Sequence, residues 1–97
     1  GLGVSMARAL PANEFGFSLC AKPGGGLVRG PMAHGSPTGV NIPVSCPAGT
    51  TFAGLFHTHP GGVSFPSAQD VQSQAKVNAP ISCIESESGG MKCFKLQ

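Results

Sequence analysis

Residues 51–70 read TFAGLFHTHPGGVSFPSAQD and carry the strongest structural signal in the chain. The β-branched and aromatic residues of Thr51–His59 predict a strand, which the Pro-Gly-Gly at residues 60–62 ends. After this break, Ser67 is suited to cap a helix that runs to about Val77, because apolar residues recur there at spacings of three and four. The centre of the chain is therefore predicted to be a strand, a loop and a helix.

The flanking sequence predicts short elements around this centre. A helical pattern over residues 2–10 stops at Pro11, and residues 14–20 alternate as a strand does. A Lys-Pro-Gly-Gly-Gly turn leads to a short strand at 27–29, and residues 81–85 and 91–96 form a hairpin. In the Gly- and Pro-rich stretch 30–50, residues 40–44 are strand-like, but Pro43 restricts them to a sheet edge if they pair at all. We expect one α+β domain over residues 1–97, with a small mixed or mostly antiparallel sheet flanked by helices.

Composition excludes several classes of function. The 97 residues have a net charge of +2, and 10% of them are charged, which is far from the basic surface of a nucleic-acid-binding protein. No apolar run approaches the roughly 20 residues of a membrane span. We therefore expect neither a nucleic acid nor a membrane as partner.

The four cysteines, Cys20, Cys46, Cys83 and Cys93, contain no C-x-x-C pair, which argues against a structural zinc knuckle. Cys83 and Cys93 flank the last hairpin and could pair across it, and Cys20 and Cys46 could join the first strand to the irregular loop. Alternatively, all four cysteines could be buried thiols that form no disulfide. An even cysteine count in a short Gly- and Pro-rich chain slightly favours a secreted or periplasmic location, although a cytoplasmic one stays open.

Three side chains in the central stretch form a pattern suited to a metal. His57 and His59 lie two residues apart on a strand, so their imidazoles project from the same face. Asp70 falls in the first turn of the following helix, from which its carboxylate can point back to the strand end. Two histidines and one carboxylate leave a fourth tetrahedral position open, as in catalytic zinc sites. Taken singly, the histidines could be packing residues and Ser67-x-x-Asp70 a capping box, but neither reading explains the joint pattern.

The spacing His57-Thr58-His59, seven residues, then Ser67-x-x-Asp70 resembles the signature of the JAMM (MPN+) zinc metallopeptidases, His-Ser/Thr-His-x7-Ser-x-x-Asp. The resemblance covers roughly residues 6–97 and is closest to compact bacterial or phage-type members. It implies a cytidine-deaminase-like core, a Zn²⁺ cofactor and cleavage of a peptide or isopeptide bond in a peptide or protein substrate.

The resemblance also implies catalytic roles for two residues. Glu14, the one acidic residue N-terminal of the histidines, looks like the family's upstream glutamate and would be the general base. Ser67 would donate a hydrogen bond to the oxyanion of the tetrahedral intermediate.

Two other functions stay open at this point. The same fold could serve as a non-enzymatic module that binds a protein or peptide by strand addition. A small disulfide-stapled secreted domain, with histidines that bind metal incidentally, is the third reading. The residues name neither the particular substrate nor the oligomeric state.

Overall fold

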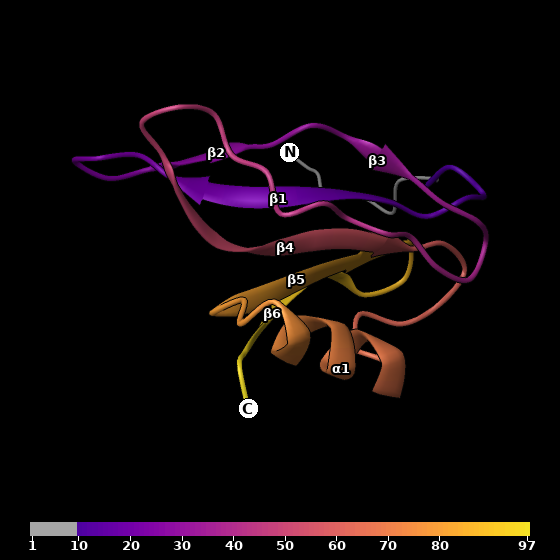
Figure 1. Cartoon of the computed structure of the whole chain (residues 1–97). Helices are drawn as coiled ribbons and strands as arrows, with labels where there is room; N and C mark the ends of the chain where they lie inside the picture. The colour runs from indigo at the N-terminus through magenta and orange to yellow at the C-terminus, as the bar shows by residue number, and fades with distance from the viewer. Residues whose placement is uncertain (1–9) are drawn as a thin grey trace.

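The sheet is built around β4, which spans Thr51–His59 as the sequence predicts. The protein is described here from a computed structural model, which defines residues 10–97. The other strands are β1 (Phe15–Ala21), β2 (Leu27–Arg29), β3 (Ala33–His34), β5 (Ile81–Ser86) and β6 (Gly90–Lys95). Their order is β2-β1-β4-β5-β6, and β3 pairs with the start of β1 (Figure 1).

One pair of strands makes the sheet mixed. β4 and β5 run parallel, whereas the other strand pairs are antiparallel. Because parallel neighbours need a crossover connection, the chain leaves β4, forms α1 (Ala68–Lys76) and returns as β5. Figure 1 shows α1 beside β5 and β6, where the buried Gln74 amide donates a hydrogen bond to the Phe94 carbonyl at 3.2 Å.

The α+β class with a mixed sheet is confirmed. Within residues 10–97 there is one helix, not several, and it is too short to cross a membrane. The helix predicted over residues 2–10 falls outside the described residues except at its last position. The closing hairpin is present, although its strands begin or end one residue away from the predicted positions.

Alternation along the strands separates two faces of the sheet. Gly16 pairs with His57 and Ser18 with Leu55, so these four residues share a face that leads to the candidate site. The opposite face carries an aromatic cluster, in which Phe56 stacks on Phe17 with ring centroids 4.7 Å apart. The histidines thus lie at the end of a central strand that is packed on both sides.

The strand-like residues 40–44, expected at a sheet edge if they paired at all, join no ladder of the described sheet. The Ser18 hydroxyl holds this segment instead, donating to the Pro43 carbonyl at 2.8 Å and accepting from the Ser45 amide at 3.2 Å. A Cys20–Cys46 disulfide ties the same segment to β1. Since Pro43 has no N–H to donate, a ladder would lose a bond there that these tethers replace. The segment 40–44 therefore lies beside the sheet without pairing with a strand.

Candidate metal centre

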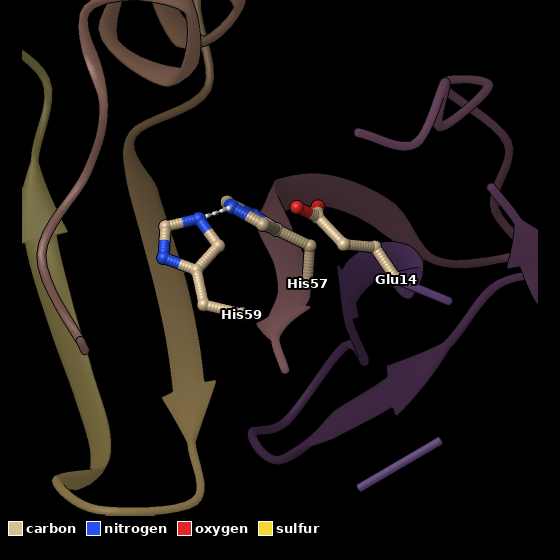
Figure 2. Close-up of side chains that lie close together, drawn as sticks. All are labelled: Glu14, His57 and His59. Carbon is tan, nitrogen blue, oxygen red and sulfur yellow. Dashed lines mark hydrogen bonds between the residues drawn. The ribbon is translucent and has the colours of Figure 1, made fainter. Parts of the chain in front are cut away.

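His57 and His59 lie side by side at the carboxyl end of β4, where Pro60 follows the strand. Their Nε2 atoms are 3.1 Å apart, and Figure 2 shows both rings turned toward each other. His57 is buried, with 4% of its surface exposed, while His59 is partly exposed. This end of β4 lies beside the end of its parallel neighbour β5, the part of such sheets where ligands usually bind.

Asp70 reaches this pair from the first turn of α1. Ser67 is the N-cap residue, its hydroxyl accepting from the Asp70 amide at 3.1 Å while Asp70 Oδ2 accepts from the Ser67 amide at 3.0 Å. The same Oδ2 atom lies 3.3 Å from His57 Nε2 and 3.0 Å from His59 Nε2. The capping box therefore does not compete with the second role of Asp70, because it holds the carboxylate against the histidines.

The hydrogen bond on the far side of His59 fixes which ring nitrogen carries its proton. Nδ1 lies 2.9 Å from the Val63 carbonyl oxygen, which can only accept, so Nδ1 must be the donor. In the neutral ring, Nε2 then presents a lone pair toward the Asp70 carboxylate 3.0 Å away. Two acceptors at this distance need a cation between them, either a proton or a metal ion. A metal-bound histidine typically donates its other N–H to a carbonyl or carboxylate in this way.

The spacing of the three donor atoms fits a tetrahedral ion. Zinc bonds of about 2.0–2.1 Å at tetrahedral angles place neighbouring ligand atoms about 3.3–3.4 Å apart. The distances observed are 3.1 Å between the two Nε2 atoms and 3.3 and 3.0 Å from these atoms to Asp70 Oδ2. Two imidazoles and one carboxylate are also a donor set that zinc accepts. His57, His59 and Asp70 are therefore arranged as three ligands of one metal ion would be.

Glu14 adds a second carboxylate to the cluster. It precedes β1, is 6% exposed and is held by its backbone, which donates to the Ser36 carbonyl and accepts from the Gly35 amide. Its carboxylate points toward His57 (Figure 2), and Glu14, His57 and His59 offer ligand atoms within 4.8 Å of one another. Glu14 could thus complete a metal site itself. Asp70 Oδ2 lies 3.3 and 3.0 Å from the two Nε2 atoms, which is closer to the spacing of zinc ligands and favours Asp70 as the third ligand.

The two carboxylates differ in their electrostatic surroundings. Burial raises the pKa of Glu14, and the nearby Asp70 charge adds to this, while the two histidines act in the opposite direction. Burial also acts to raise the pKa of Asp70, but the hydrogen bonds from His57 and the Ser67 backbone, together with the histidine charges, outweigh it and hold that pKa well below its usual range. The lowered pKa favours the charged form of Asp70, which suits ligation, whereas the raised pKa of Glu14 suits proton exchange.

Two positions that sequence reasoning missed hold the site in place. Thr58 points away from the histidines and is fully buried, and its Oγ1 accepts from the Phe15 amide at 3.0 Å, which fixes the residue after Glu14 against β4. The buried Ser64 hydroxyl donates to the Gly90 carbonyl at 2.7 Å and contacts the Ser86 hydroxyl at 2.7 Å. These bonds attach the loop between His59 and Ser67 to the last hairpin. The family signature has only Ser or Thr between the two histidines, and this restriction was the signal in the sequence that could have pointed to Thr58.

A cleft of about 410 Å³ opens beside the cluster and is lined by Glu14, His57 and Asp70 among other residues. Ser67 does not line it, since its hydroxyl lies at the helix cap. The structure therefore brings together four of the five residues predicted for the site and leaves Ser67 at its rim. The predicted cysteine pairs are both present as disulfides, Cys20–Cys46 and Cys83–Cys93.

Fold and cluster together define a small α+β domain with a candidate metal centre at the end of a central strand. The family of prokaryotic homologs of the JAB domain matches residues 38–97, which is more than half of the chain, and the chain belongs to this family. The match includes both histidines, Ser67 and Asp70, whereas Glu14 lies outside it and enters the site through the fold. Comparisons with curated proteins and with solved structures found no match.

Proposed function

We propose that this protein is a zinc-dependent hydrolase of peptide or isopeptide bonds, a JAMM-type metallopeptidase. The observation that carries the proposal is the convergence of His57 Nε2, His59 Nε2 and Asp70 Oδ2 within 3.3 Å, with Glu14 buried beside them. If Ser67 and Asp70 formed only a capping box and the histidines only packed in the core, nothing would require the Nε2 lone pair of neutral His59 to face the Asp70 carboxylate. Membership of the JAB-domain family agrees with the proposal.

In this mechanism His57, His59 and Asp70 would hold the ion and Glu14 would move the proton. Zinc, when bound, supplies a Lewis acid that brings the pKa of water down to about 7. The Glu14 carboxylate takes the proton of the attacking water and passes it to the leaving amine. Its raised pKa suits this double role, because a group that must both accept and donate works best with a pKa closer to neutrality.

Ser67 is proposed to stabilise the developing oxyanion. Its Oγ already accepts from the Asp70 amide at 3.1 Å, so the hydroxyl proton is available to donate. Because Ser67 caps α1, the reacting carbonyl would approach from the α1 side to reach it. Removing such a donor typically costs about 10²–10³-fold in rate.

The cleft supports a peptide as the substrate. Its volume of about 410 Å³ lies in the range of small-ligand sites, roughly 300–1,000 Å³, and suits a short chain segment better than a folded domain. One wall is formed by residues 40–43, and the backbone of residues 40–42 makes no hydrogen bond to other backbone groups within residues 10–97. An extended peptide can pair with this free edge. The same observation favours a second candidate, a non-enzymatic module that binds peptides.

One substitution separates the enzyme from the binding module. In Glu14→Gln the general base is lost, so zinc-loaded protein should lose about 10²–10⁴-fold in the rate of peptide cleavage while its zinc content and peptide affinity stay unchanged. Cleavage of a peptide library is followed by mass spectrometry, and zinc by atomic emission. Glu87→Gln, the same change outside the cleft, is the matched control and should keep the parental rate. A parental rate in Glu14→Gln contradicts this mechanism, and peptide binding without cleavage by the parent favours the module.

The two disulfides indicate an oxidising compartment, and we propose that the protein acts outside the cytoplasm, in a secreted or periplasmic location. Titration of thiols in the unfolded, unreduced protein isolated from its natural source should find none of the four cysteines free. Four reactive thiols would contradict this location and leave the catalytic proposal untouched.

A further inference from the structure

The cleft continues past the metal cluster along α1. Besides Glu14, His57 and Asp70, the lining is residues 40–43, Leu55 of β4, Ser82 of β5, Ser73 and Lys76 of α1, and the C-cap residue Val77. The metal cluster occupies the end near Asp70. Lys76 also lines the cleft, and its place six residues beyond Asp70 on α1 puts it toward the other end. It is exposed, so its ammonium group is accessible to a ligand that lies in the cleft.

The spacing along the helix sets the distance between the two ends. Lys76 follows Asp70 by six residues on α1, which is a rise of about 9 Å. An extended peptide covers about 3.3–3.6 Å per residue. A substrate whose scissile bond lies at the metal cluster would therefore bring a group two to three residues away next to Lys76.

The end of the cleft near Lys76 differs in charge from the end near the metal cluster. Among the residues that line it, the two carboxylates, Glu14 and Asp70, lie at the metal end, where a divalent ion would balance them. Lys76 is the one cationic residue of the lining, and no ion pair joins it to a carboxylate within residues 10–97. The uncharged part of the lining is more apolar than polar. It has Val40, Ile42, Pro43, Leu55 and Val77, together with Asn41, Ser73 and Ser82.

Building on the proposed hydrolase function, we propose that Lys76 is a specificity residue for an anionic substrate. The cleft takes a peptide with an apolar residue next to the scissile bond and a carboxylate two to three residues from it. That carboxylate is either the free C-terminus of the peptide or an Asp or Glu side chain. An interaction of this kind, between an accessible ammonium and a carboxylate, is expected to change kcat/KM by about 3- to 10-fold.

A peptide series tests the proposal. A neutral peptide of Ala, Gly and Leu is prepared with a single Glu moved along it, and separately with a C-terminal carboxylate or carboxamide. The zinc-loaded parent should cleave best when one negative charge lies two to three residues from the cut. Lys76→Gln should raise KM for those peptides about 3- to 10-fold without changing kcat, and should leave neutral peptides unaffected. Which of the two sets shows the effect distinguishes the chain end from the acidic side chain.

Two further variants control for a structural role of Lys76, which also lies in the last turn of α1. Lys92→Gln removes a lysine outside the cleft and should behave as the parent. Lys76→Glu should reverse the preference toward peptides with a lysine at the same position, which a loss of helix stability would not do.

The outcomes separate this proposal from the proposed function. If the parent cleaves no peptide, the hydrolase proposal fails, and the same peptides are then tested for binding to zinc-loaded Glu14→Gln protein with and without Lys76→Gln. Equal affinity of these two proteins for anionic peptides overturns the role of Lys76. A preference for anionic peptides that persists in Lys76→Gln also overturns it, because the anion would then be bound by the metal.

Discussion

Removing the Cys20–Cys46 disulfide should destabilise the protein more than any single surface change. The bond closes a loop of 26 residues, and constraint of the unfolded chain by a loop of that length is worth about 3.5 kcal/mol. The Cys83–Cys93 bond closes 10 residues, for about 2.7 kcal/mol. A domain of 97 residues has a total stability of about 5–15 kcal/mol, so either loss is a large fraction of it.

The position of Cys46 adds a reason for the larger effect. Most residues of the segment 30–50 are exposed or half-buried, so little apolar burial holds it to β1. The remaining tethers near Cys46 are the two hydrogen bonds of Ser18, to the Pro43 carbonyl and from the Ser45 amide. Without the disulfide, the cleft wall at residues 40–43 should loosen, which raises KM for peptides while zinc binding stays intact.

Urea unfolding of the double variants, followed by circular dichroism without reductant, measures these effects. Cys20→Ala with Cys46→Ala should lower the free energy of unfolding by about 3–4 kcal/mol, and Cys83→Ala with Cys93→Ala by about 2–3 kcal/mol. An unchanged midpoint in the first variant, or a larger loss in the second, would contradict the dependence of stability on loop length and on the attachment of residues 40–43.

Two further substitutions test how the site is supported. Thr58→Val keeps the shape of the buried side chain but leaves the Phe15 amide without its acceptor. The free energy of unfolding should therefore fall by about 1–3 kcal/mol. The same change at the exposed Thr51 is the control and should alter it by less than about 0.5 kcal/mol. Because burial raises the pKa of Glu14, folding favours its neutral form, and its charged form lowers stability once the pH exceeds the unfolded-state value. Metal-free Glu14→Gln should therefore gain stability over the parent at pH 7 and lose that gain near pH 4; a variant no more stable than the parent at pH 7 would contradict the burial of this carboxylate.

The elements with strong local signals could be predicted from the sequence. Thr51–His59 forms the predicted strand, and the helix that Ser67 caps ends within a residue of the expected position, because strand composition and capping are local properties. Residues 40–44 carry the same kind of signal but pair with no strand of the described sheet. Their conformation depends on Ser18 and Cys46, which are contacts that a local pattern does not contain.

The features of the candidate site also differ in how far the sequence predicts them. The proximity of Asp70 to the histidines follows from a capping box next to a strand end, and both are visible in the sequence. The bond from His59 to the Val63 carbonyl, the burial of Glu14 and the place of Lys76 in the cleft depend on how the loop, β1 and α1 pack together. The parallel pairing of β4 with β5 could not be predicted either, because register across a crossover is a long-range property.

We propose that His57, His59 and Asp70 hold one zinc ion, with Glu14 beside it. Anomalous diffraction at the zinc edge from crystals of the zinc-loaded protein tests this most directly. We expect one peak about 2.0–2.2 Å from His57 Nε2, His59 Nε2 and Asp70 Oδ2, with the Glu14 carboxylate beyond bonding distance and a water molecule between. A peak bonded to Glu14 in place of Asp70, or no peak at the two histidines, would contradict it.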